Sequence, residues 1–150
     1  MHHYQSILVA VDFSDSSDKA LARAVQLASF YKASIKVVHV MELPTYPVLE
    51  DVAVMGLPGV WDPELTEQIQ KVSVERLNKL LTESGLNESH GKLLIGAASN
   101  EILEYAHQMS AELIVMGRHG SSGWKSLLGS TTDTVLHQAS CDVLAINLEK

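Results

Sequence analysis

This sequence has little cysteine, few aromatic residues and no long hydrophobic run. Its one cysteine, Cys141, excludes an internal disulfide and favours a reducing compartment. The apolar runs are far shorter than the roughly 20 residues that a membrane helix needs. The first residues lead directly into a strand-like run, with no signal peptide pattern. We therefore expect a cytoplasmic protein that neither spans nor binds a membrane.

Basic residues are also scarce. The chain has 11 Lys and Arg against 18 Asp and Glu, and its net charge is -7. Such an acidic surface argues against general binding to nucleic acid, but not against one phosphate held by local backbone N–H groups. The 46% hydrophobic and 19% charged content of 150 residues is typical of a globular protein. We expect a single domain over residues 1–150.

Short apolar runs alternate with amphipathic segments along the chain. Strands are predicted over 6–11, 35–40, 92–95, 113–116 and 142–148. Helices are predicted after the capping residues near positions 14, 62, 99 and 129, with Asp62 and Ser99 as two of the N-caps. The expected inward residues of the second helix are Leu65, Ile69, Val72, Leu77, Leu80 and Leu81. This alternation predicts an α/β fold: a five-stranded parallel, doubly wound, Rossmann-like sheet with helices on both faces.

The connection over residues 41–63 breaks this pattern. It contains all four prolines, at positions 44, 47, 58 and 63, together with several apolar residues. Long irregular connections are uncommon in compact domains and are often functional. Two interpretations stay open: a loop folded onto the domain surface, and a lid or partner-binding segment.

The stretch over residues 113–136 combines a predicted strand, a glycine-rich turn and a helix start. Glycines allow backbone N–H groups to approach phosphate oxygens, and a helix N-terminus favours negative charge. The stretch does not match the G-x-x-x-x-G-K-[ST] or G-x-G-x-x-G phosphate loops, nor the G-x-S-x-G nucleophile turn. It therefore predicts an anion-binding cradle of another type.

Gly117, Gly120 and the pair Gly129-Ser130 are spaced as G-x2-G-x8-G-S. This spacing resembles the ATP-binding signature G-x2-G-x9-G-[ST] of the universal stress protein family, although the second spacer is one residue shorter. The runs ILVAVDFS at 7–14, VVHV at 37–40, AELIVMG at 111–117 and CDVLAI at 141–146 also resemble that family. The resemblance covers nearly the whole chain and implies a fold of the adenine nucleotide α-hydrolase type.

The resemblance also implies an adenine nucleotide, ATP or AMP, with or without Mg²⁺. Asp12 would bind the ribose, an apolar slot would hold the adenine, and the glycine turns would hold the phosphates. The implied nucleotide-binding residues are Ala10, Val11, Asp12, Val40, Met116, Gly117, Gly120, Gly129, Ser130 and Thr131. A carboxylate suits a ribose diol, and a helix N-terminus suits phosphates.

Each of these residues has a structural alternative. Asp12 could be the N-cap of the first helix, and Gly129-Ser130 could cap a helix beside an empty pocket. Cys141 is expected to pack as a small hydrophobe, and His119 is a weak candidate for a general base. The seven histidines have no metal-ligand spacing, so we expect no metal site. No carboxylate pair for Mg²⁺ accompanies the glycine turn, so efficient catalysis is not expected.

The last strand is predicted at an edge of the sheet, where apolar residues favour pairing with another strand. The resemblance implies a homodimer through Val143, Leu144, Ala145 and Ile146; shielding of this edge by Glu149 and Lys150 is the alternative. The resemblance thus implies a nucleotide-binding sensor or regulator in stress response. Two alternatives are a nucleotide-free interaction module and a weak ATPase.

Overall fold

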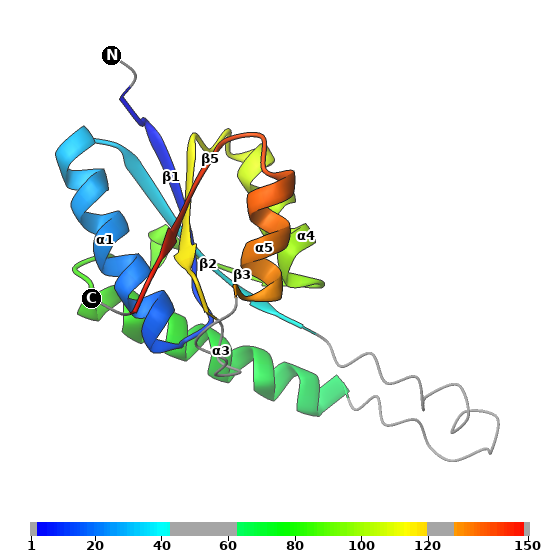
Figure 1. Ribbon diagram of the computed structural model, residues 1–150. Helices are drawn as coiled ribbons and strands as arrows, with labels where there is room; N and C mark the ends of the chain where they lie inside the picture. The colour runs from blue at the N-terminus through cyan, green and yellow to red at the C-terminus, as the bar shows by residue number, and fades with distance from the viewer. Residues whose placement is uncertain (1–2, 43–62, 120–127, 149–150) are drawn as a thin grey trace.

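A computed structural model describes residues 3–42, 63–119 and 128–148 of the chain (Figure 1). The strands are β1 (Ser6–Ala10), β2 (Ser34–Met41), β3 (Gly91–Ile95), β4 (Leu113–Gly117) and β5 (Asp142–Ile146). The helices are α1 (Asp15–Tyr31), α3 (Pro63–Glu83), α4 (Ala98–Gln108) and α5 (Ser130–Gln138), with a 3-10 turn, η1 (Glu88–His90), before β3. The predicted α/β fold is confirmed.

The sheet has the strand order β3-β2-β1-β4-β5, and every neighbouring pair is parallel. The central strand is β1, in which Val9 lies beside Val37 of β2 and Val115 of β4. Ile7, Leu8 and Val9 have no exposed surface. A strand that is buried on both faces reads as a continuous apolar run, which is the pattern found in the sequence.

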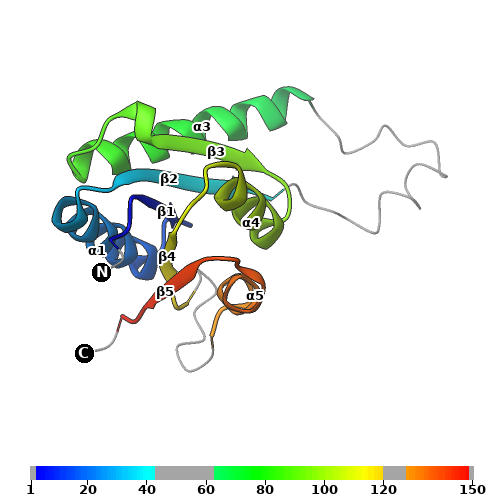
Figure 2. The same cartoon turned by 90° about the horizontal axis from the view of Figure 1, so that it is seen from above.

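Helices cover both faces of the sheet, and each face has its own hydrophobic core (Figure 2). On one face, α1 and α3 contribute Leu21 and Leu81, which pack with strand residues such as Val9. On the other face, α4 and α5 contribute Ile102 and Val135, which pack with residues such as Leu8. Alternate residues of β1 therefore serve different cores.

The predicted buried face of α3 is wrong for the first half of the helix. Leu77 and Leu81 are buried as expected, but Leu65 is 51% exposed, Ile69 48% and Val72 55%. The reason is geometric, because the first half of α3 extends beyond the sheet edge, where no strand lies beneath it (Figure 1). Neither α3 nor any other helix in the described ranges is long and apolar enough to cross a membrane.

The predicted helix ends were partly correct. Gly85 follows the end of α3 with φ +76°, a conformation that glycine adopts without strain. Ser99, however, is not the N-cap of α4: the helix begins at Ala98, and its N-cap, Ala97, has no side-chain hydrogen bond. Asp62 and most of the proline-rich connection lie outside the described residues.

We expect Leu81→Ala to lower the free energy of unfolding by about 3 kcal/mol, because it leaves a cavity in a fully buried position. Leu65→Ala is the matched control on the same helix and should cost less than about 1 kcal/mol, because Leu65 is half exposed. Urea unfolding of both variants measures the difference. Equal losses would contradict this assignment of the α3 faces.

Candidate functional site

A pocket of about 390 Å³ lies at the carboxyl edge of the sheet. Its walls come from the ends of β1, β2 and β4 and from the first turns of α1, α4 and α5. In a doubly wound sheet this edge, at the point where the strand order reverses, is the usual ligand position. The lining residues are Ala10, Val11, Asp12, Ser17, Val38, Val40, Glu42, Ala98, Ile102, Met116, Gly117, His119, Gly129, Ser130, Thr131 and Thr132.

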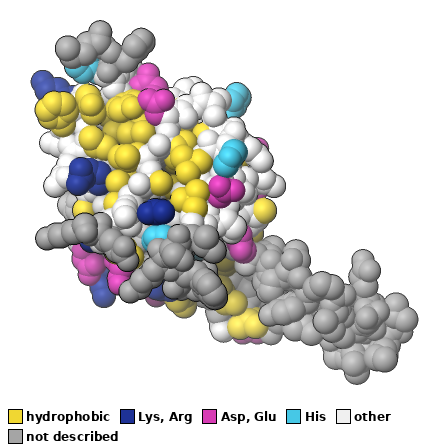
Figure 3. All heavy atoms as spheres, viewed as in Figure 1, with side chains coloured by type: hydrophobic (Ala, Val, Ile, Leu, Met, Phe, Trp, Pro, Cys, Tyr) yellow, Lys and Arg dark blue, Asp and Glu magenta, His cyan; other side chains and the backbone are white. Residues whose placement is uncertain are grey.

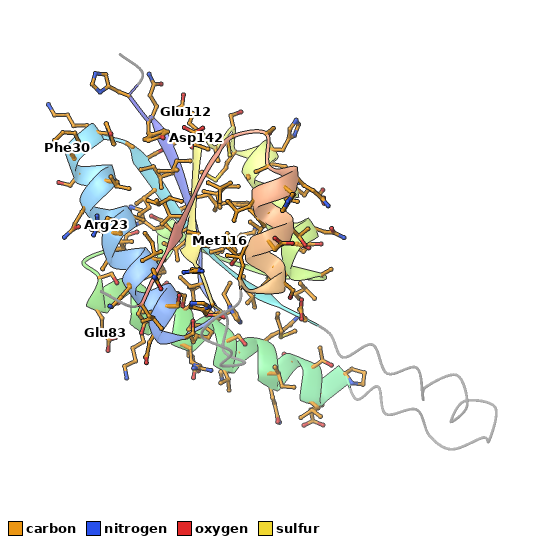
Figure 4. All side chains as sticks on the ribbon, viewed as in Figure 1. Arg23, Phe30, Glu83, Glu112, Met116 and Asp142 are labelled. Carbon is orange, nitrogen blue, oxygen red and sulfur yellow. The ribbon has the colours of Figure 1, made fainter. Side chains whose placement is uncertain are left out.

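Nine of the ten residues predicted to bind a nucleotide line this pocket, and Gly120 lies outside the described residues. Met116 illustrates the arrangement, since its side chain lies between β4 and α5 (Figure 4). The nucleotide-binding role of these residues stays a prediction. The predicted nucleotide-binding set omitted seven lining residues, although His119 was considered separately as a general base: Ser17, Val38, Glu42, Ala98, Ile102, His119 and Thr132. For Ala98 and Ile102 a signal existed, because the predicted α4 begins at the same sheet edge.

Asp12 follows β1 at the lip of the pocket. Its Oδ1 accepts a hydrogen bond from the Ser14 N–H at 3.0 Å and another from the Ser14 hydroxyl. The N-cap of α1 is Ser14, whose hydroxyl oxygen accepts from the Ser17 N–H at 3.3 Å. The alternative interpretation of Asp12 as the helix cap is therefore wrong, and its carboxylate belongs to the pocket wall.

Phe13, the next residue, anchors this turn through contacts with β2 and α3. Its φ of +62° is unusual for a residue with a side chain. The Phe13 ring lies 4.3 Å from the His39 ring, between centroids, and the Arg76 guanidinium carbon lies 4.2 Å from the Phe13 centroid. The His39 Nδ1 is 2.8 Å from the Val11 carbonyl oxygen. Contacts from β2 and α3 thus hold the turn that carries Asp12.

The opposite wall is built from the end of β4. The Thr132 hydroxyl donates to the Gly117 carbonyl at 2.8 Å. The Gly129 N–H donates to the Arg118 carbonyl at 2.9 Å, and the Arg118 N–H donates to Ile146 of β5 at 2.8 Å. These bonds fix the start of α5 beside the end of β4. His119, the residue after Arg118, is also buried.

The first turn of α5 presents backbone donors to the pocket. The first hydrogen bond within the helix runs from the Asp133 N–H to the Gly129 carbonyl, so the N–H groups of Ser130, Thr131 and Thr132 have no acceptor inside the helix. The N-cap Gly129 supplies no side-chain acceptor. This end of the pocket therefore favours an anion.

The acidic lining residues, Asp12 and Glu42, lie just beyond the ends of β1 and β2. Nearby, burial raises the pKa of the Asp18 carboxyl, and the charges of Asp15 and Asp12 raise this pKa further. Among the described residues, no three His, Cys, Asp or Glu side chains are grouped so as to hold a metal ion. The described lining is therefore acidic near β1 and rich in N–H donors near α5.

Cys141 lies just before β5 and packs against the core beneath α4 and α5. Burial raises the pKa of its thiol, and the neighbouring Asp142 raises it further. A thiol with a raised pKa stays protonated at neutral pH and reacts slowly. These contacts agree with the expected role of a small hydrophobe.

The sequence profile described as "Universal stress protein family" matches residues 3–147. The chain belongs to the universal stress protein family. A relative in Coxiella burnetii, universal stress protein A homolog 2, is 32% identical over 151 residues, which cover 99% of each protein. The resemblance inferred from the glycine spacing and strand motifs is thus confirmed.

Solved structures of other universal stress proteins have the same fold. One in complex with cAMP has a TM-score of 0.66 and 24% identity, and covers 99% of this chain and 100% of its own. One from Archaeoglobus fulgidus, in complex with dAMP, has a TM-score of 0.59 and 21% identity, and covers 97% of this chain and 99% of its own. At these identities the likeness establishes the fold alone.

In this universal stress protein, Gly117 permits close contact between β4 and α1. A Cβ at this position would lie 2.4 Å from the Ser16 Oγ and 2.9 Å from the Ser16 backbone carbon. We expect Gly117→Ala to lower the free energy of unfolding by about 2 kcal/mol. The double variant with Ser16→Ala should recover little, because the backbone contact remains. Thermal unfolding tests this, and full recovery by the second change would show that the side chain alone was responsible.

Proposed function

We propose that this universal stress protein binds an adenine nucleotide in the pocket at the carboxyl edge of its sheet. The observation that carries the proposal is the convergence of Asp12, Val40 and the α5 N-terminus on one cavity. These groups lie 28 or more residues apart in the sequence, and their chemistry matches ribose, base and phosphate in turn. The family membership and the titles of the two complexes, with cAMP and dAMP, support the same ligand class.

The size and polarity of the pocket support a mononucleotide. A volume of about 390 Å³ lies within the range of small-molecule sites. Apolar side chains at one end, Val38, Val40 and Ile102, suit the faces of a purine ring. Backbone donors at the other end, in the first turn of α5, suit a phosphate. We propose ATP or AMP as the nucleotide, with Mg²⁺ accompanying ATP.

We further propose that the protein acts as a cytoplasmic homodimer in stress response, as a sensor or regulator. The support is the place of β5 at an edge of the sheet, with Val143, Leu144, Ala145 and Ile146 each only partly buried. Hydrophobic side chains gather on the face that β5 crosses (Figures 1 and 3). An apolar edge strand favours pairing with a second copy.

Denaturation of the purified protein should release ATP or AMP, at up to about one molecule per chain. If the nucleotide is lost during purification, added ATP or AMP at about 100 times its Kd should raise the melting temperature by about 5 °C or more. Mass spectrometry and thermal unfolding provide the two measurements. Failure of both would favour the alternative of a nucleotide-free interaction module.

Gly129→Val should abolish the thermal shift produced by the nucleotide and leave the melting temperature of the free protein nearly unchanged. The φ and ψ of Gly129, -62° and 144°, suit valine, whereas the new side chain would occupy the entrance to the α5 N-terminus. Thr134→Val, on the same helix but outside the pocket lining, is the control and should retain the shift. An undiminished shift in Gly129→Val would contradict this phosphate position.

A further inference from the structure

The pocket is lined by the N-termini of two helices, α4 and α5, and these differ in whether a side chain accepts a hydrogen bond from the helix N–H groups. At the end near β2, Glu42 lies just beyond the strand, and its Oε1 accepts a hydrogen bond from the Ala98 N–H at 3.0 Å. Ala98 is the first residue of α4, whose N-cap, Ala97, makes no side-chain hydrogen bond. A carboxylate from a neighbouring strand therefore performs the capping that the α4 sequence itself does not supply.

At the end near β4, the N-cap of α5 is Gly129, which has no side chain to accept a hydrogen bond, and Ser130, Thr131 and Thr132 of the first turn line the pocket. An anionic ligand group is therefore favoured at α5 over the other end, where the exposed Glu42 carboxylate carries a charge of the same sign. A nucleotide in this pocket has its phosphate at α5. Its base consequently lies toward Val40, Ile102 and Glu42.

The Glu42 carboxylate can distinguish one purine from another. Oε1 is engaged with Ala98, and the second oxygen of an ionised carboxylate is an acceptor. Adenine carries a 6-amino group, which donates hydrogen bonds. Hypoxanthine carries a 6-oxo group, which accepts them, and a proton on N1. A carboxylate oxygen placed opposite position 6 would face the oxo oxygen with no proton between them. The apolar side chains beside Glu42 suit the faces of either ring and do not discriminate between them.

We propose that Glu42 is a specificity-determining residue of this site: its carboxylate selects a 6-aminopurine over a 6-oxopurine at the β2 end of the pocket. The inference rests on the proposed nucleotide function and deepens it. It names a residue that the glycine signature does not contain and that lies 87 positions before Gly129.

The test compares AMP with IMP, which share ribose and phosphate and differ in the group at position 6 and in the proton on N1 of the base. Isothermal titration of the full chain should give a Kd for AMP about tenfold lower than that for IMP. In Glu42→Gln the ratio should fall below about threefold. The amide oxygen can still accept from the Ala98 N–H, which preserves the helix cap, and the amide NH₂ can donate to the 6-oxo group.

Glu101→Gln is the matched control. Glu101 lies in the first turn of the same helix, with its carboxylate beside Gly96, but it is not among the pocket-lining residues given above. This variant removes the same charge from the same helix end and should keep the wild-type ratio. Equal melting temperatures of the two variants would exclude a general effect on folding.

The outcomes separate the two proposals. A wild-type protein that binds neither nucleotide would overturn the proposed function and this inference together. A wild-type protein that binds AMP and IMP equally would overturn this inference alone. AMP preference that persists unchanged in Glu42→Gln would also overturn it, since the selection would then come from another group. An equal change in the ratio of the two Kd values in Glu101→Gln would also overturn this inference, because the effect would then come from the charge at the helix end and not from contact with the base.

Discussion

The pocket depends on the reversal of the strand order next to β1. From β1 the chain moves outward to β2 and β3, and then returns across the sheet to β4 and β5. Right-handed crossovers put the helices of the outward part, α1 and α3, on one face and those of the other part, α4 and α5, on the opposite face. The connections that leave β1 and β4 therefore diverge, and none of the helices in the described ranges covers the edge between them. The position of the site therefore follows from the sheet topology alone and does not depend on particular side chains.

The sequence could predict this fold because each strand has a local signature. A central strand such as β1, buried on both faces, requires an uninterrupted apolar run, and few alternatives to a strand accommodate one between two turns. Residues at the ends of such runs must meet at one sheet edge. Ala10, Asp12, Val40 and Gly117 were for this reason predictable as neighbours before any coordinates, although they come from three separate strands.

What the sequence could not predict depends on contacts between distant elements. The amphipathic pattern of α3 runs along the whole helix, but the part that is buried depends on where the sheet ends, which no local pattern encodes. Ser99 has a good capping side chain, yet Glu42, 56 positions away from Ala98, occupies the helix N-terminus instead. The turn after β1 depends similarly on Arg76 and His39, neither of which is near Phe13 in the sequence.

Glu42 also bears on the ligand orientation that we propose. Both α4 and α5 begin at the same sheet edge, and an N-terminus of either helix would by itself attract an anion. Without the Glu42 carboxylate, a ligand with one charged end would meet a helix N-terminus in either of two opposite orientations. The hydrogen bond from the Ala98 N–H to Glu42 occupies one donor of the α4 N-terminus, whereas the α5 N-cap, Gly129, supplies no side-chain acceptor, and we propose that the ligand phosphate lies at α5. In the orientation that we propose, the hydrogen bond between Glu42 and Ala98 therefore marks the base end of the pocket, and the α5 N-terminus marks its phosphate end.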